Sequence, residues 1–500
     1  MATRFSCALA IGLLGCSSSD SPNPAVDSST GDGAGDATSE VATDATDAGI
    51  DTHPAKGVFP NGFLWGAATA GYQVESNPAV PSDWGVWETL VGKIKNADKA
   101  TGGPDEWAHY DADLALAQSL GLTAFRFSIE WARIEPTQGT FDEAAIAHYA
   151  ALIASCKAHG LKPVVTLWHF VDPKWVLDPT AGAKSLGGWT NKATADAFVS
   201  FVTRVVPRFA DDVDFWITLN EPMVAITNGY FFGSWPPGGS FDEAGAIASH
   251  NNMIDAHVRA FDAIHTLYSA KSRPVTVTIA SHWVAFDPKT PADADATKGV
   301  AHLFNEAFLD AIVNGDVDTG LNGTVTHRDD YAHHLDLLGL NFYQHQLVTG
   351  VKLGIVPGLN EDDPAAKHKS DLGWELYPQG LGRALDELSA RYKLPIVITE
   401  NGVADAADKY RSWYLVTHLQ EVQKAIARGI DVRGYIHWAL IDNFEWAEGL
   451  APRFGLIGVD YTTADKKRTT RTSAGAFTDV IQANEVTPAV VTKWGVEPSP

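Results

Sequence analysis

Residues 214–221 read DFWITLNE, a short apolar run that ends in two polar residues. The run itself, 214–219, is rich in β-branched and aromatic residues, which is typical of a strand buried on both faces. Seven other runs of this kind occur along the chain, at 62–67, 124–129, 163–168, 275–280, 336–341, 395–399 and 433–440. We therefore expect eight parallel strands.

Stretches with the apolar spacing of amphipathic helices lie between these runs. Residues 140–159 open with Thr140-x-x-Glu143, the pattern of a capping box. Residues 192–209 and 412–428 also show helical spacing. Eight alternations of strand and helix predict an α/β protein with a (β/α)8 barrel, the TIM barrel.

The predicted barrel spans residues 57–485 and forms a single domain. Pro207 should kink or end the second of the helices named above, because proline removes a helical hydrogen bond. The stretches 281–335 and 344–394 are so long that each must hold an insertion as well as a helix. Residues 486–500 are expected to form a C-terminal tail.

The composition limits the classes of partner. The 500 residues are 45% hydrophobic and carry a formal net charge of -24 at pH 7. So acidic a chain repels nucleic acid and anionic membrane surfaces, and neither is predicted as a partner. Two of the three cysteines, Cys7 and Cys16, lie near the N-terminus, which leaves Cys156 alone and excludes a disulfide framework in the folded part.

The N-terminus has the pattern of an export signal at residues 1–15. Arg4 precedes an apolar run that is too short to span a bilayer. The ending LLGC resembles the cleavage site of bacterial lipoproteins, which implies that Cys16 becomes the lipidated first residue. Ser17 resembles the residue found in lipoproteins sent to the outer membrane. The alternative is an ordinary signal peptide and a soluble secreted protein.

Residues 16–56 are expected to form a disordered acidic linker. They consist mainly of Ser, Asp, Thr, Ala, Gly and Pro, and residues 17–52 carry eight acids and no Lys or Arg. Such a segment buries too little apolar surface to offset the entropy lost on ordering the chain. We interpret it as a tether between a lipid anchor and the folded domain.

Polar residues gather at the carboxyl ends of the predicted strands. Because these ends share one rim of a barrel, their side chains should meet there. Buried polar groups cost free energy unless they are paired, so such a cluster indicates a network or a ligand site. The residues are Gln73, Arg126, His169, Asn220, Glu221, Asn341, Tyr343, Glu400, Asn401, Glu445 and Trp446.

Two of these residues are glutamates, Glu221 after the fourth strand and Glu400 on the seventh. Cleavage of a glycosidic bond needs two such carboxyl groups, one to donate a proton and one to attack or to direct water. That reaction needs no cofactor, and the chain shows no phosphate-binding glycine loop and no HExxH motif. His333 and His334 precede the sixth strand at its other end, so we predict no metal site.

The motifs resemble glycoside hydrolase family 1, the β-glucosidase-like family, over about residues 57–485. TLNEP and ITENG, in this order and followed by DNFEW, are the most specific of them. The matching segments are FLWGAATAGYQVE (63–75), FRFSIEWARIEP (125–136), TLWHF (166–170), GGWTN (187–191), TLNEP (218–222), GLNFY (339–343), ITENG (398–402) and WALIDNFEWAEGLAPRFG (438–455).

The resemblance implies a retaining β-glycosidase that acts on terminal, non-reducing β-D-glycosyl residues through a glycosyl-enzyme intermediate. It implies that Glu221 is the acid/base and Glu400 the nucleophile. Arg126 and Tyr343 would bond to the nucleophile and keep it ionised. Asn220 would hold the sugar 2-hydroxyl.

The resemblance also implies the groups that bind substrate. Trp438 would floor the sugar ring, and Trp374 is similar to a tryptophan on the acceptor side. The expected substrates are β-linked glucosides, related small oligosaccharides and aryl glycosides. The remaining hydroxyls would meet Gln73, His169, Glu445 and Trp446, while Asn341 would support the catalytic pair.

The two glutamates are expected to differ in charge state. Glu221 lies near a negative Glu400 and lacks a cation of its own, so its pKa should be raised. Once Glu400 is glycosylated, that pKa should fall and the acid should become a base. We expect the two carboxyl groups to lie about 5–5.5 Å apart, the distance of retaining enzymes.

The chain departs from the family pattern on the acceptor side. Phe170 stands where a tryptophan is common, and Ala439 replaces a frequent serine. The fifth strand ends in Ser281-His282-Trp283, unlike the family. These departures bear on sugar preference, for which glucose is favoured over galactose only weakly.

Other functions fit less well. Enzymes for phosphorylated sugars resemble this chain but hold phosphate at positions that here are Glu445, Pro452 and Phe454, and a carboxylate would repel it. Plant thioglucosidases lack the acid/base that Glu221 would supply. A catalytically idle, glycan-binding surface lipoprotein is disfavoured because both glutamates and their expected partners are present.

Overall fold

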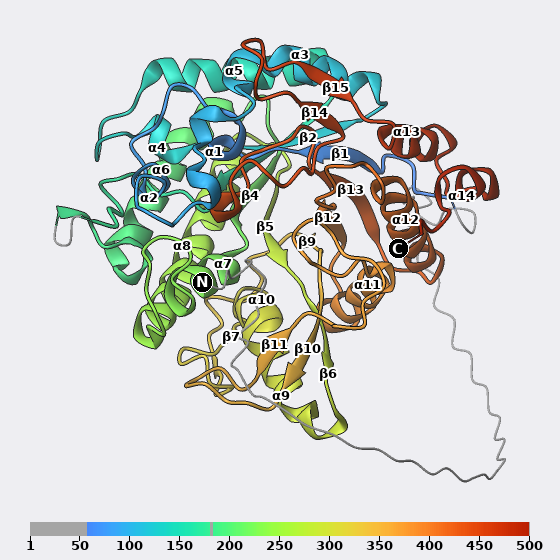
Figure 1. Ribbon diagram of the computed structural model, residues 1–500. Helices are drawn as coiled ribbons and strands as arrows, with labels where there is room; N and C mark the ends of the chain where they lie inside the picture. The colour runs from blue at the N-terminus through green and yellow to red at the C-terminus, as the bar shows by residue number, and fades with distance from the viewer. Residues whose placement is uncertain (1–57, 181–183, 500) are drawn as a thin grey trace, which may run out of the picture.

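The computed structural model describes residues 58–180 and 184–499 (Figure 1). The predicted leader 1–15, the lipidation site Cys16 and the linker 16–56 lie outside the described residues, so these assignments stay predictions. A search of the described residues finds no helix whose length and apolarity would let it cross a membrane.

Eight parallel strands close into a barrel in the order β1-β13-β12-β9-β5-β4-β3-β2. Each strand end lies within two residues of the end predicted from its apolar run, so the (β/α)8 barrel is confirmed. The strands are β1 (Leu64–Ala68), β2 (Ala124–Ser128), β3 (Lys162–Trp168), β4 (Phe215–Asn220), β5 (Thr276–His282), β9 (Leu338–Asn341), β12 (Ile396–Asn401) and β13 (Val432–Trp438).

Helices surround the barrel (Figure 1). The long ones are α3 (Glu106–Ser119), α5 (Glu143–Ala158), α6 (Lys192–Phe209), α8 (Glu243–Ala270), α11 (Pro378–Tyr392), α12 (Arg411–Ala427) and α13 (Ala474–Ala483). Shorter ones are α1 (Gly71–Val74), α2 (Asp83–Trp87), α4 (Trp131–Ile134), α7 (Pro222–Ile226), α9 (Ala294–Ala301) and α10 (Ala307–Val313).

Two local expectations about helices need comment. The capping box predicted at Thr140 is wrong, because α5 begins later and the Asp142 carboxylate accepts hydrogen bonds from the N–H groups of Ala144 and Ala145. Pro207 lies inside α6, which ends two residues beyond it at Phe209.

The two long stretches do hold insertions. A three-stranded sheet, β11-β10-β6, is built from β6 (Ala285–Pro288), β10 (His345–Thr349) and β11 (Leu359–Glu361). Strand β6 follows β5 directly, and β10 follows β9, so the sheet extends the rim where these barrel strands end, at the lower side of Figure 1. Two further strand pairs are β7 (Asp316–Val317) with β8 (Thr326–His327) and β14 (Ile457–Val459) with β15 (Arg468–Thr470).

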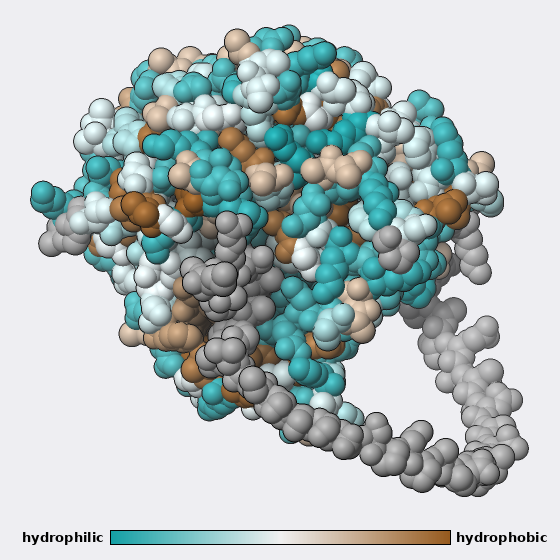
Figure 2. Space-filling model, viewed as in Figure 1, coloured by the Kyte–Doolittle hydropathy of each residue, from teal (hydrophilic) through white to brown (hydrophobic). Residues whose placement is uncertain are grey.

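The segment expected as a C-terminal tail contains helix α14 (Pro488–Trp494). Val490 is buried, and the Trp494 indole donates a hydrogen bond of 2.7 Å to Asp479 of α13. Glu497 accepts a hydrogen bond from His368 at 2.8 Å. The segment therefore packs on the barrel domain. The face of the molecule shown in Figure 2 is mostly hydrophilic where it is coloured, with small separate apolar patches.

Candidate active site

Glu221 and Glu400 line one cavity of about 1210 Å³ at the carboxyl ends of the barrel strands. Their residues are only 7% and 4% exposed. The strand carrying each glutamate shifts register just before it, between Ile217 and Asn220 in β4 and between Ile398 and Glu400 in β12. Such irregularities re-aim side chains, and here they accompany the turn of both carboxyl groups into the cavity.

The backbone at Glu221 is unusual. Its φ of 43° lies in the left-handed region, which costs a non-glycine residue about 1–3 kcal/mol and is common at functional sites. The Glu221 N–H donates a 2.7 Å hydrogen bond to the Ala280 carbonyl of β5, and Pro222 then begins α7. These contacts hold the residue in its strained conformation.

Glu400 has a cation and a phenol as partners. The Arg126 guanidinium donates to Oε1 at 2.5 Å, and the Tyr343 hydroxyl donates to Oε2 at 2.6 Å. Burial, with the nearby carboxylates, raises the pKa of Tyr343, so its hydroxyl remains a donor. Arg126 is itself held by the Thr166 hydroxyl and the Thr399 carbonyl. This arrangement stabilises Glu400 as a carboxylate.

Among the described residues, the hydrogen-bond partner of the Glu221 side chain is a neutral amide. The Asn341 amide donates to its Oε1 at 2.7 Å. Burial and the negative charge of Glu400 raise the pKa of Glu221 well above its usual value. The predicted direction is confirmed, and the surroundings of Glu221 favour its protonated form.

Asn220 connects the two halves of the site. Its Oδ1 accepts a hydrogen bond from Arg126 at 2.6 Å and another from Asn341 at 3.3 Å, and its Nδ2 lies 3.4 Å from His169 Nε2. Burial, together with the charge of Arg126, lowers the pKa of His169, so this imidazole is neutral. The amide of Asn220 therefore has a fixed orientation.

Glu445 and Gln73 form a polar group at the other side of the cavity. The Gln73 amide nitrogen lies 2.9 Å from the Phe444 carbonyl and 3.4 Å from Glu445 Oε2, which also accepts from Asn443 at 2.8 Å. Burial raises the pKa of Glu445 to about 8. The Gln73 Oε1 atom is buried and has no hydrogen-bond partner in the part of the chain that the structure describes, so it can accept a hydrogen bond from a ligand hydroxyl.

Aromatic rings line the space between these polar groups. The His169 ring stacks near both Trp438 and Trp446, at centroid distances of 5.8 Å and 6.1 Å. Trp374 also lines the cavity, and its ring centroid lies 5.8 Å from that of Tyr343. Flat apolar rings beside hydrogen-bonding groups suit a sugar, which has apolar faces and a polar edge.

The structure brings together the residues predicted to act in catalysis or to bind substrate in the folded part. Those that line the cavity are Gln73, His169, Glu221, Tyr343, Trp374, Glu400, Trp438, Glu445 and Trp446. Arg126, Asn220 and Asn341 are buried and hold the glutamates through the hydrogen bonds described above. Asn401, which was also expected at this rim, instead bonds to the Phe342 carbonyl and to the hydroxyls of Tyr414 and Tyr435.

Sequence reasoning missed the residues that two π-helical turns bring to the cavity. One turn, Thr227–Phe231, supplies Asn228 and Phe231, and the other, His302–Glu306, supplies Phe304. π-turns are rare and often mark functional sites, but they have no reliable sequence pattern. His282, one of the departures from the family pattern, also lines the cavity.

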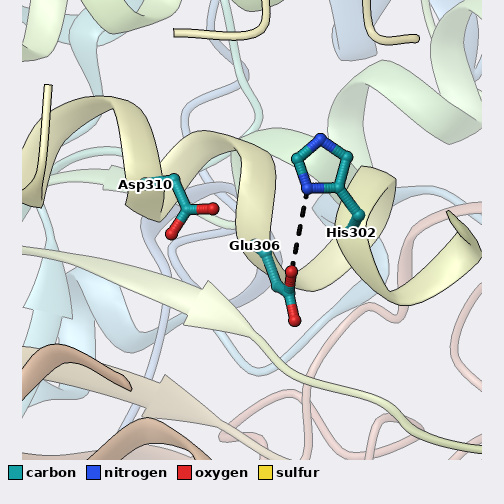
Figure 3. A group of neighbouring side chains, drawn as sticks. All are labelled: His302, Glu306 and Asp310. Atoms are coloured by element: carbon teal, nitrogen blue, oxygen red, sulfur yellow. Dashed lines mark ion pairs between the residues drawn. The ribbon is translucent and has the colours of Figure 1, made fainter. Parts of the chain in front are cut away.

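One cluster of ligand-type side chains lies outside the cavity, on the stretch that bears the second π-turn. Figure 3 shows His302 pointing toward Glu306, with Asp310 on the next turn. The Arg391 guanidinium already bonds to Asp310 at 2.9 Å and lies 3.2 Å from Glu306. A cation thus already pairs with these carboxylates, and we interpret the cluster as an ion-pair network.

A second cluster joins His345, Asp363 and Glu375. Both ring nitrogens of His345 already contact carboxylates, Glu375 at 2.6 Å and Asp287 at 3.0 Å. Neither nitrogen has a free lone pair for a metal in this arrangement, since an imidazole bonded to two carboxylates donates from both nitrogens.

Comparison with known proteins agrees with this geometry. The family described as "Glycosyl hydrolase family 1" matches residues 55–486. A β-galactosidase of Saccharolobus solfataricus is 33% identical over 86% of this chain and 98% of its own length. β-Glucosidase A of Thermotoga maritima is 32% identical over 85% of this chain and 98% of its own length.

Solved structures give the same result. A β-glycosidase from Pyrococcus horikoshii superposes with a TM-score of 0.78 and 31% identity, covering 89% of this chain and 99% of that one. A family 1 β-glucosidase from Thermotoga maritima superposes with a TM-score of 0.77 and 30% identity, covering 86% and 99%. The chain belongs to glycosyl hydrolase family 1.

Proposed function

We propose that the chain is a retaining β-glycosidase that removes terminal, non-reducing β-D-glycosyl residues by double displacement. The observation that carries this proposal is the unequal surroundings of the two glutamates. Glu400 is bonded to a guanidinium and a phenol, whereas Glu221 is bonded to an amide. One is therefore kept ionised for attack, and the other is kept protonated for donation.

In the first step, a Glu400 oxygen bonds to the anomeric carbon while the glycosidic bond breaks. Glu221 gives its proton to the departing oxygen. In the second step, Glu221 takes a proton from water, the water oxygen bonds to the anomeric carbon, and Glu400 leaves. Glycosylation removes the charge of Glu400, which is one of the causes that raise the pKa of Glu221, and so favours this change of role.

We place the sugar ring between Trp438 and the polar groups of Gln73, His169 and Glu445. The relatives are named β-galactosidases as well as β-glucosidases, and the carboxyl and amide of Glu445 and Gln73 can meet a 4-hydroxyl of either orientation. We propose that β-glucosides are the preferred substrates. Turnover of nitrophenyl β-glucoside, β-galactoside and β-fucoside by the full-length protein gives the order of sugar preference. No turnover of any of them would contradict the proposed glycosidase activity.

The nucleophile has its own test. Glu400→Gly should abolish hydrolysis of nitrophenyl glycosides, because no carboxylate remains to attack. Added azide should restore nitrophenol release and yield the α-glycosyl azide, since azide then attacks from the vacant face. A β-glycosyl azide would instead show that Glu400 is not the nucleophile.

We also propose that the protein is exported and anchored by a lipid on Cys16 at the outer membrane. The support is the order of apolar run, LLGC and acidic linker in the sequence. Cys16→Ser should move the protein from the detergent phase to the aqueous phase in a Triton X-114 partition. Aqueous partition of the unaltered protein would favour soluble secretion.

A further inference from the structure

His282 lies beside the proposed acid/base, at the end of β5. It pairs with Asn341 in the register of β5 and β9, and Asn341 is the residue that bonds to Glu221. Two residues earlier, Ala280 accepts the hydrogen bond of the Glu221 backbone. The imidazole is thus fixed by the same two strands that hold Glu221, and it lines the cavity.

The imidazole has no hydrogen-bond partner among the described residues. Its Nδ1 atom lies 3.9 Å from Glu221 Oε2, which is too long for a hydrogen bond, and its buried Nε2 atom is unpaired. The rings of Phe304 and Tyr343 stand nearly perpendicular to it, at 5.7 Å and 5.9 Å. The side chain is 11% exposed, so its orientation is set by packing.

Burial lowers the pKa of His282 to about 4, so the ring is neutral at the pH of ordinary assays. It therefore places no positive charge beside Glu221. A neutral imidazole has one donor and one acceptor nitrogen, and a hydroxyl group can bond to either. The ring is suited to a polyhydroxylated ligand and not to an ionic one.

The position of the acidic proton on Glu221 indicates which part of a bound substrate lies near His282. Asn341 donates to Oε1, so the acidic proton is placed on Oε2, the oxygen next to His282. The departing oxygen of the substrate must approach Oε2. The groups attached to that oxygen, which belong to the aglycone, then lie within reach of Nδ1.

We propose that His282 is a specificity-determining residue that binds a hydroxyl group of a sugar aglycone, next to the bond being cleaved. The inference rests on the proposed function and names its substrate class, β-linked disaccharides and short oligosaccharides. In a sugar aglycone the carbons next to the glycosidic carbon carry polar groups, whereas an alkyl chain carries none. An alkyl aglycone would displace water from the imidazole and leave it unpaired, which is unfavourable.

The cavity has room for such an aglycone. Its volume of about 1210 Å³ exceeds the usual range for small-ligand pockets, which ends near 1,000 Å³. Beyond His282 the wall continues with Val284, Phe304, Gln344 and Gln346, a mixture of apolar and amide groups. Both features fit a second sugar unit.

The test compares two substrates with the same sugar and equally poor leaving groups, cellobiose and hexyl β-glucoside. In His282→Ala, the ratio of kcat/KM for cellobiose over hexyl β-glucoside should fall about tenfold or more, because a hydrogen bond in the bound state is lost. His282→Asn, which places an amide group near the position of Nδ1, should restore part of the ratio. Lactose and hexyl β-galactoside form the parallel pair.

Val284→Ala is the matched control, since this neighbour lines the same wall without a polar atom. Val284→Ala should change kcat/KM for both substrates by a similar factor and leave their ratio unchanged. If His282→Ala lowers kcat/KM equally on both substrates, the ratio is unchanged and the ring acts only through Glu221. If kcat/KM is unchanged on both substrates, the ring binds no aglycone. Either result overturns the inference while the unaltered enzyme still cleaves both substrates; failure of the unaltered enzyme on every glycoside would instead overturn the proposed function.

Discussion

Glu221 and Glu400 are chemically identical side chains whose neighbours give them different charge states. The cation and the phenol at Glu400 have no counterpart at Glu221, whose partner is the Asn341 amide. Sequence motifs could place both glutamates at strand ends, and family resemblance could assign their roles. The bond between Asn341 and Glu221 joins residues 120 positions apart, so it could be described only once the barrel was known.

The charge of Glu400 should be measurable in the titration of Glu221. In Glu400→Gln the pKa of Glu221 should fall relative to the unaltered protein, because one of the causes that raise it is removed. Carbon-13 NMR of the labelled glutamate carboxyl groups follows this change. Asn341→Asp is a useful contrast, since a new negative charge beside Glu221 should raise its pKa further; an unchanged value in Glu400→Gln would contradict the electrostatic coupling.

Arg126 should be needed for stability as well as activity. Arg126→Met would leave Glu400 as a buried charge without its cation, which typically costs about 3–5 kcal/mol. The free energy of unfolding, from denaturant titration, should fall by this order, and turnover should fall with it. The matched control is Arg433→Met, which breaks an exposed pair with Asp431 and should cost less than about 1 kcal/mol.

At the scale of elements, the barrel strands could be predicted because each is a run of apolar residues buried on both faces. The strands of the inserted sheet could not, since β6 and β11 contain only four and three residues and offer no periodicity to detect. His282 was visible in the sequence, but its unpaired nitrogens became evident only in the cavity.

The inserted sheet is joined to the loop of Trp374 by a histidine between two carboxylates. His345 of β10 contacts Glu375 at 2.6 Å and Asp287 at 3.0 Å, and Arg383 also bonds to Asp287, at 2.8 Å. Burial opposes the charged imidazolium, but the hydrogen bonds and charges of the carboxylates outweigh it, so the pKa of His345 is raised. The contact should therefore depend on pH.

A raised pKa in the folded protein means that His345 stabilises it most below the ordinary value of 6.5 and loses this effect as pH rises through the raised pKa. The difference in Tm between the unaltered protein and His345→Gln should shrink as the pH rises above 6.5 and through the raised pKa. Calorimetry measures it. His327→Gln is the control, because His327 also lies between two aspartates but is exposed, and its difference should be smaller throughout. A constant difference for His345→Gln would contradict the prediction.

At the scale of the whole molecule, the C-terminal segment contributes to stability and not to chemistry. Helix α14 buries Val490, and Glu497 bonds to His368; none of these three residues lines the cavity. Removal of residues 486–500 should lower the free energy of unfolding by about 1–3 kcal/mol, as expected for the loss of a few buried side chains. Calorimetry should show a lower Tm, while kcat/KM for nitrophenyl β-glucoside at room temperature should stay within about twofold.

The closure of the barrel has a consequence for how the protein is made. Strand β1 is the first barrel strand to leave the ribosome and β13 the last, and the pairing of Leu64 with Gly434 joins them. Until translation reaches residue 438, the nascent sheet has two open edges, which are templates for aggregation. Trp438, a wall of the cavity, arrives with the same strand. Sealing of the sheet is thus a late event in biosynthesis, followed by Glu445 and Trp446 in completing the site, and a chain truncated before β13 has neither a closed sheet nor a complete site.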